Sequence, residues 1–244
     1  MATPQEQLAA QLQSKFLPVS STWLNNFFLA QQRNIPIAAL TQTALFRILN
    51  SDFRESLTTR NPTSILPVDI FDPNVQERRL TGSIPVQVLD IEDIGTSIWS
   101  QVEAIERVER GEAVRGREIV RTVNVGEEEH DGAANRSTNA NANAGADTAS
   151  ESSGPYRLIL QDAKGTRAVG IEMTRINGIA IDKLAIGGKL LLRNATVARG
   201  MILLTPESVS LLGGKIESMD QAWKAGRKAS LLEKVTTGTG GEGA

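Results

Sequence analysis

The chain has 244 residues, of which 40% are hydrophobic and 22% charged, a composition typical of a globular protein with one medium domain or two small ones. Its formal net charge of −2 means that the chain as a whole is not a polycation that would coat nucleic acid. The absence of cysteine excludes disulfides, thiol nucleophiles, thiolate zinc sites and iron–sulfur clusters.

The first 62 residues predict a small bundle of three helices and one further helical turn. Apolar residues recur at helical spacing in each segment, and aromatic residues in such stripes belong to a core far more often than to a cofactor site. Brief connections between the segments favour helices that pack on one another. The helix-start signals are the capping box Thr3-Pro4-Gln5-Glu6, Ser20 or Ser21, Pro36 and Asp52.

Residues 63–219 predict strands instead. An extended, proline-punctuated connector comes first, and five segments follow whose composition and alternation indicate strands. A short helical piece at 181–184 is expected between the third and fourth strands, which is the element order of an OB barrel. The predicted strands are 85–91, 156–162, 167–173, 189–197 and 201–206.

Residues 220–244 form the last predicted unit, a helix with a disordered end. Ser218-Met219-Asp220-Gln221 is a second capping box, and the helix is expected to run to about Lys234. The final residues, TTGTGGEGA, have the composition of a disordered tail. The fold class is therefore α+β: an N-terminal three-helix bundle, a five-stranded OB-fold barrel and a C-terminal helix.

A long insertion, about residues 101–154, separates the first and second predicted strands. Its second half contains no large apolar residue, so it cannot bury enough surface to offset the entropy of ordering. Its first half, by contrast, mixes apolar and cationic residues between Val114 and Val125. Two readings stay open: a short extra strand on its own barrel, or an arm that becomes ordered in a partner, which is slightly favoured.

The sequence offers no catalytic or metal-binding constellation. His130 is the single histidine, and it lies in an acidic run without a companion at ligand spacing. The glycine pairs at 187–188 and 213–214 lack the spacing of a phosphate-binding loop. We therefore predict no catalytic residue, no metal, no cofactor and no small-molecule substrate. With no secretory leader and no apolar run of about 20 residues, an intracellular protein without a membrane partner is expected.

Binding of single-stranded nucleic acid is the alternative function, because it is common among OB barrels. Such binding needs aromatic rings on which bases stack, each worth about 1–3 kcal/mol. Tyr156 is the one aromatic residue in the predicted strands. From Pro155 to Lys228, 12 Lys and Arg stand against 6 Asp and Glu, but these cations are scattered in the sequence. The sequence therefore favours a protein-binding barrel over an autonomous nucleic-acid binder.

With this layout, the chain resembles the RecQ-mediated genome instability protein 1 family, the OB-fold partner of topoisomerase III, in its short fungal form. The resemblance covers most of the first 220 residues. Its motifs are SDFR (51–54), GSIPVQVLDIEDIG (82–95), Trp99-Ser100-Gln101, RLILQD (157–162) and the long run GGKLLLRNATVARGMILLTPESVSLLGGKIESM (187–219).

The resemblance implies a nuclear, non-catalytic subunit of a RecQ helicase–topoisomerase III complex that dissolves double Holliday junctions. In that family the insertion reaches into the topoisomerase gate and favours decatenation, and DNA is contacted weakly or through the complex. A Tudor-family relative with a similar barrel is a further alternative, but it would carry a downstream Tudor domain, which we do not expect here. The expected topoisomerase contacts are Arg115, Arg117, Ile119, Val120, Arg121 and Val123 on the insertion, with GREIVR (116–121) as the contact element, and Trp99 and Lys189 on the barrel.

Overall fold

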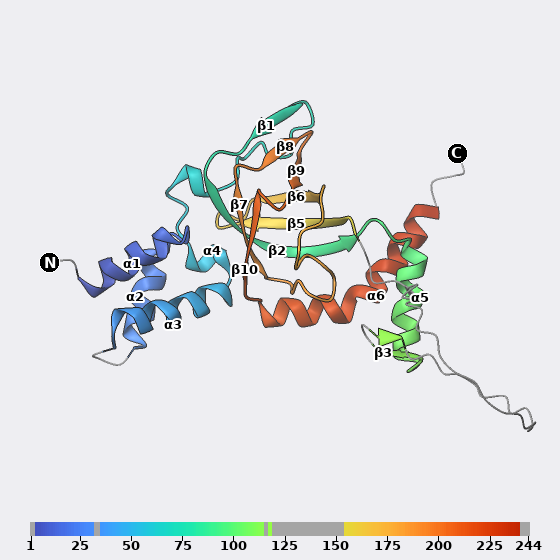
Figure 1. The fold of residues 1–244 in the computed structure, drawn as a ribbon, viewed down its shortest axis with the longest axis horizontal. Helices are drawn as coiled ribbons and strands as arrows, with labels where there is room; N and C mark the ends of the chain where they lie inside the picture. Colours follow the sequence, from blue (N-terminus) through green and yellow to red (C-terminus); the bar gives the residue numbers. More distant parts are fainter. Residues whose placement is uncertain (1–2, 32–34, 115–116, 119–153, 240–244) are drawn as a thin grey trace, which may run out of the picture.

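The computed structural model describes residues 3–31, 35–114, 117–118 and 154–239. A helical domain lies at one end, a curved β-sheet forms the centre, and a pair of helices lies at the other end (Figure 1). Among the described residues, no helix has both the length and the hydropathy needed to cross a membrane.

The N-terminal helices begin where the capping signals predict. In α1 (Pro4–Ser14), the Thr3 hydroxyl accepts a bond from the Glu6 amide and the Glu6 carboxylate accepts one from the Thr3 amide, which completes the capping box. Ser20 caps α2 (Ser21–Leu29), and Asp52 caps α4 (Phe53–Ser56). The third helix, α3 (Ile37–Leu49), follows Pro36. Their shared core is apolar and consists of Leu8, Leu12, Leu17, Leu24, Phe27, Leu40, Ala44, Ile48, Phe53, Leu57 and the barrel residue Ala163.

The barrel is built from one eight-stranded sheet in the order β1-β8-β9-β6-β5-β2-β7-β10. All its neighbouring strands are antiparallel except β6 and β9, which run parallel. The long central strand β2 pairs with β5 on one side and β7 on the other, and a register shift between Val88 and Asp90 helps it to curve. The strands are β1 (Glu77–Arg79), β2 (Ser83–Asp93), β5 (Tyr156–Asp162), β6 (Arg167–Glu172), β7 (Lys189–Arg193), β8 (Thr196–Ala198), β9 (Met201–Leu204) and β10 (Val209–Gly213).

Several predicted elements differ from the observed ones. The strand expected at 189–197 is two strands, because Asn194 adopts a left-handed conformation, φ 47°, between β7 and β8. The helix expected at 181–184 is a single turn, closed by a bond from the Leu184 amide to the Ala180 carbonyl. The edge strands β1 and β10 and the 3₁₀ turn η1 (Pro62–Ser64) were not predicted.

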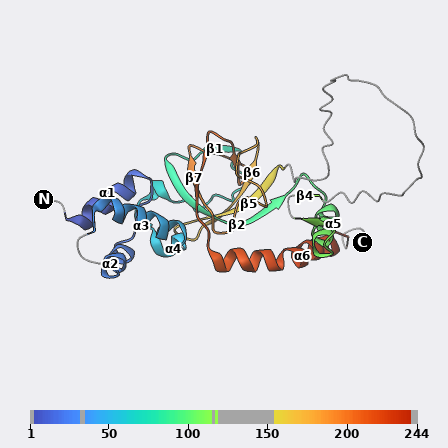
Figure 2. The ribbon, with the colours of Figure 1, turned by 60° about the horizontal axis from the view of Figure 1, so that its bottom comes forward.

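The C-terminal helix α6 begins and ends elsewhere than predicted. It spans Glu217–Thr239, so Ser218 lies inside the helix rather than capping it. The hydroxyls of Thr236 and Thr237 bond to the Glu233 carbonyl within a stretch expected to be disordered. Figure 2 shows α6 running along the barrel from the side of the helical domain to α5 at the other end.

The insertion begins with a helix that was not predicted. This helix, α5 (Ile98–Glu109), is capped by Ser97, whose hydroxyl accepts a bond from the Ser100 amide. After it, β3 (Ala113–Val114) and β4 (Arg117–Glu118) pair with each other in a separate two-stranded sheet. In the described part of the insertion, no segment therefore adds a strand to the barrel sheet, contrary to the first of the two readings.

The helical domain and the barrel also meet closely where β10 passes the end of α3. Gly214 has φ 76°, and a Cβ atom there would collide with the Leu49 carbonyl. The next amide, Lys215 N, donates to Asn50 Oδ1 at 3.3 Å. A side chain at Gly214 would therefore have to push the end of α3 away from the barrel.

We expect Gly214→Ala to destabilise the protein more than Gly213→Ala. Both glycines have a positive φ, but a Cβ atom at Gly213 would meet nothing within 4 Å. The left-handed backbone alone costs a non-glycine residue about 1–2 kcal/mol, which Gly213→Ala should show. The collision with Leu49 should add roughly 1–3 kcal/mol in Gly214→Ala. Free energies of unfolding from urea titrations would measure the difference, and equal losses would mean that α3 does not approach this closely.

Candidate protein-interaction surface

Most of the predicted insertion contacts lie outside the described residues. These are Arg115, Ile119, Val120, Arg121 and Val123. Arg117 is described only as the backbone of the first residue of β4. Their predicted role therefore stays a prediction, and the structure describes the base from which the insertion leaves the barrel.

This base, here called the insertion root, comprises residues 94–109: the end of β2's connector and α5. Trp99 is the second residue of α5, and 63% of its side chain is exposed. Ile94 is 47% exposed just before the helix. A largely exposed tryptophan is an unusual expense of apolar surface in water, and tryptophan is enriched among the residues that dominate protein interfaces. The predicted contact Trp99 is thus accessible to a partner.

Helix α5 is held against α6 by polar contacts. The Lys228 ammonium lies 3.2 Å from a Glu106 carboxylate oxygen and 2.7 Å from one of Glu109. One turn away, the Arg227 guanidinium donates to Gln101 Oε1 at 3.4 Å. Gln101 itself is buried, and its amide donates to the Asp93 and Thr96 carbonyls. These bonds tie the first turns of α5 to both the barrel and α6.

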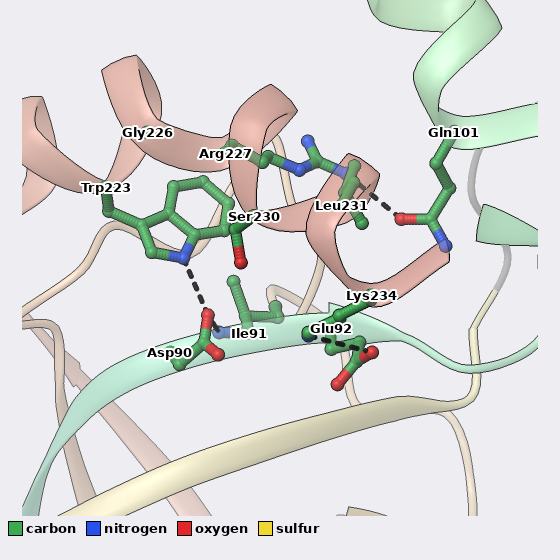
Figure 3. Close-up of a pocket in the computed structure, with 10 residues that line it drawn as sticks. All are labelled: Asp90, Ile91, Glu92, Gln101, Trp223, Gly226, Arg227, Ser230, Leu231 and Lys234. Carbon is green, nitrogen blue, oxygen red and sulfur yellow. Dashed lines mark hydrogen bonds and ion pairs between the residues drawn. The ribbon is translucent and has the colours of Figure 1, made fainter. Parts of the chain in front are cut away.

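Helix α6 is in turn attached to β2 across a shallow pocket of about 250 Å³ (Figure 3). The Trp223 indole donates to Asp90 Oδ1 at 2.6 Å, and the Lys234 ammonium lies 3.1 Å from Glu92. The charged groups of the pocket are thus already paired with each other, as expected of a structural seam rather than a ligand site. The lining residues are Asp90, Ile91, Glu92, Gln101, Trp223, Gly226, Arg227, Ser230, Leu231 and Lys234.

Glu92 is the clearest electrostatic contact of this seam. Burial alone would raise the pKa of its carboxyl, but hydrogen bonds and charge from Lys234 and then Arg157 outweigh it and lower the pKa. The carboxylate therefore stays ionised and pairs with two strands' worth of cations, one of which belongs to α6. It has no free oxygen-bound proton to offer as an acid at neutral pH.

The predicted barrel contact Lys189 is placed quite differently. Its side chain is 0% exposed, so both a solvated lysine and a direct surface contact with a partner are wrong for this residue in the folded chain. Its ammonium donates to the Gly187 carbonyl at 2.7 Å and to Gln87 Oε1 at 3.1 Å. It also lies 4.8 Å from the centre of the Phe53 ring, which belongs to the helical domain.

Lys189 is part of a buried polar junction between the two domains. Its members are Asp52 and Phe53 from the helical domain and Gln87, Gln161 and Lys189 from three adjacent strands. The Gln87 amide nitrogen donates to Asp52 Oδ1 at 2.9 Å and to Gln161 Oε1 at 3.2 Å. Its oxygen accepts from the Phe53 amide at 3.0 Å as well as from Lys189. Both atoms of this buried amide are thereby satisfied.

Burial lowers the pKa of Lys189 to about 7, although the nearby Asp52 charge opposes the shift. Removing the ammonium from water costs free energy, and a neutral amine avoids that cost. The junction is therefore most favourable when Lys189 is neutral. The lysine contributes to the fit of the domains, and no reacting group lies beside it among the described residues.

The structure offers little that would support catalysis or base stacking in the described strands. The ring of Tyr156 is 0% exposed, so it cannot stack on a nucleic-acid base. In the described ranges, no group of three or more His, Cys, Asp or Glu could hold a metal ion. Gly187 and Gly188 form the turn that leads into β7, as the sequence suggested.

Two features of the site escaped sequence reasoning. The start of α5 is marked by Ser97 and by apolar residues at 98, 102 and 105, a helical signal that was assigned to the insertion loop. The buried junction left only the weak signal of a lysine at the start of an apolar strand. Nothing local to Gln87 or Gln161 indicates that these amides meet.

Comparison with known proteins places this arrangement among relatives. The model of the RMI1 N-terminal OB-fold domain matches residues 66–227, and that of the RMI1 N-terminal helical domain matches residues 8–56. A curated protein of Schizosaccharomyces pombe, RecQ-mediated genome instability protein 1, is 28% identical over 221 residues, covering 88% of this chain and 89% of its own length.

The buried lysine predicts a specific pH dependence of stability. Because the pKa of Lys189 is lowered from 10.5 to about 7 on folding, the unfolded chain binds more protons between these values. The cost of burying the ammonium is present in full below pH 7 and is relieved as the pH rises. Between pH 7 and 9, this relief should raise the free energy of unfolding by about 2 kcal/mol, at 1.36 kcal/mol per unit.

We expect Lys189→Met to abolish this rise, because methionine fills the site without a titrating group. Lys183→Met, which changes an exposed lysine, should retain it. Chemical unfolding of the wild type and both variants at a series of pH values tests this. The same rise in all three proteins would contradict the assignment to Lys189.

Proposed function

Because the chain belongs to the RMI1 family, we propose that it is a non-catalytic adaptor of genome stability that assembles with topoisomerase III and a RecQ-family helicase. The observation that carries the proposal is the insertion root: an exposed tryptophan on a helix that is fixed to the barrel and leads into a long insertion. We further propose that the complex acts in the nucleus, where it promotes decatenation and the dissolution of double Holliday junctions.

The proposed docking surface is the insertion root together with the adjacent barrel. Trp99 is the anchor, because it offers a large apolar surface on a helix that does not have to be ordered on binding. The attachment of α5 to α6 through Glu106, Glu109 and Lys228 supports this rigidity. Lys189 leaves the list of direct contacts and acts by keeping the two domains together.

The proposed mechanism needs no catalytic group. A bound subunit changes a topoisomerase cycle only if it binds the open and closed gate with different affinity. We assign this difference to the insertion, where Ile119, Val120 and Val123 bury apolar surface and Arg115, Arg117 and Arg121 pair with carboxylates or DNA phosphates. The root then holds the complex together while the insertion acts on the gate.

Binding to topoisomerase III should depend on Trp99. We expect Trp99→Ala to weaken the complex by tenfold or more, since truncation of an anchoring tryptophan costs about 2 kcal/mol or more. Phe46→Ala is the matched control, because Phe46 is an aromatic residue on α3 that is 70% exposed at the opposite end of the molecule. Titration calorimetry with purified topoisomerase III measures both. Equal affinities of the two variants would contradict the assignment of the root, and no complex with the wild type would contradict the adaptor function.

The insertion should affect the topoisomerase cycle more than the affinity. We expect a chain in which residues 119–153 are replaced by a Gly-Ser linker of equal length to bind topoisomerase III within about threefold of the wild type, because the root supplies the anchor. The same chain should fail to stimulate decatenation of linked DNA circles. Unchanged stimulation would show that the side chains of the insertion do not act on the gate. This design keeps α5, which a deletion from residue 102 would remove.

A further inference from the structure

The cations of the described surface fall into two groups. At the end that carries α5 and α6 they are paired with carboxylates: Arg110 with Glu112 at 3.0 Å, Lys228 with Glu109, and Lys234 with Glu92. At the other end of the barrel, where it meets the helical domain, they are not. Four exposed cations there have no carboxylate oxygen within 4 Å in the described structure: Lys15, Arg60, Arg79 and Arg193.

These cations gather around one aromatic ring, Phe16, and together with it they are here called the junction corner. The Arg193 guanidinium lies over the Phe16 ring, 5.1 Å from its centre. Arg79 donates from Nε to the Asn194 carbonyl at 3.1 Å, which places it beside Arg193. Figure 1 shows the end of α1 and the connector through η1 on the β7 side of the barrel.

Arg60 reaches the same corner by backbone pairing. Val19 and Leu57 form an antiparallel bridge, and the Thr58 amide donates to the Pro18 carbonyl at 2.8 Å. In an antiparallel pair one chain advances as the other recedes, so the next residues toward Arg60 run alongside those toward Phe16. Lys15 precedes Phe16 directly. The corner thus combines two segments of the helical domain side with two strand ends of the barrel.

Phe16 is held in place by the way α1 ends. The residue adopts a left-handed conformation, φ 62°, which is rare for an aromatic residue. Its amide donates to the Gln13 carbonyl at 2.9 Å, and the following Leu17 amide donates to the Leu12 carbonyl at 3.0 Å. With Leu17 buried, these bonds leave 43% of the Phe16 side chain exposed beneath Arg193. The ring and the guanidinium are therefore ordered before any ligand arrives.

We propose that the junction corner binds a single-stranded nucleic acid, with Lys15, Arg60 and Arg79 on its phosphates and the Phe16–Arg193 pair against its bases. Unpaired cations attract phosphates, and both an aromatic ring and a guanidinium plane stack on bases regardless of sequence. An acidic peptide would satisfy the cations but would leave the preformed stack without a partner. With the Tyr156 ring buried, this site is separate from the groove that the strands would offer.

The proposal is independent of the topoisomerase docking surface. The corner and the insertion root lie at opposite ends of the barrel (Figure 1). A variant of the corner should therefore keep the affinity for topoisomerase III while losing affinity for nucleic acid. Failure of one proposal leaves the other standing.

The test is a salt titration of the full chain with a fluorescent oligo-dT of about 16 nucleotides. We expect Arg79→Gln with Arg193→Gln to weaken binding at least about fivefold, and to reduce the slope of log K against log salt by about 1.4, or 0.7 per lost phosphate contact. The control, Arg167→Gln with Lys183→Gln, removes the same charge from exposed cations elsewhere on the barrel and should change neither quantity. Phe16→Leu should weaken binding at unchanged slope, because it removes the ring but no charge.

Three results would overturn the proposal. The first is no binding of oligo-dT by the wild type at low salt, and the second is an equal loss in the corner and control variants, which would indicate diffuse attraction. The third is binding of poly-glutamate as tight as that of oligo-dT, which would assign the corner to an acidic peptide. Circular dichroism melts of each variant, together with Arg193→Gln alone, separate a loss of binding from a loss of folding.

Discussion

The Gln87 side chain is the contact on which the arrangement of the two domains depends. Its amide bonds to Asp52 and Phe53 of the helical domain, and to Gln161 and Lys189 of the barrel. A buried amide that loses such partners costs free energy, and a helical domain in another orientation could not supply them. Apolar contacts alone would hold the domains together in several similar orientations. The polar junction selects one, and in doing so it sets the corner where Phe16 meets Arg193.

Strand β2 carries this constraint to the other end of the molecule. Gln87 lies in its first half, whereas Asp90 and Glu92 in its second half bind Trp223 and Lys234 of α6. Helix α6 begins beside Asn50 at the end of α3 and reaches α5 at the far end. One strand and one helix thus connect both ends, so the insertion leaves from a base whose position relative to the helical domain is defined.

The distribution of charge gives the two ends different chemistry. Around α5 and α6, carboxylates and cations pair within the chain and serve to hold helices, which leaves apolar Trp99 as the accessible feature of the root. At the junction corner the cations have no such partners in the described structure and surround an exposed ring. An adaptor that grips a protein at one end can thereby touch a passing strand at the other. Neither action requires a group that reacts.

By itself, the sequence determined the elements whose signals are local. The capping box at Thr3, the Ser20 cap and the strand 156–162 are all where the pattern predicts, because hydrogen bonds and apolar spacing within a few residues decide them. Lys189 could not be placed in this way, since its acceptor Gln87 lies 102 positions away and its ring partner Phe53 lies in another domain. For the same reason the sequence showed scattered arginines where the fold brings Arg60, Arg79 and Arg193 toward one ring. Burial, pairing and charge density are properties of the surroundings of a side chain, and only the tertiary structure decides what those surroundings are.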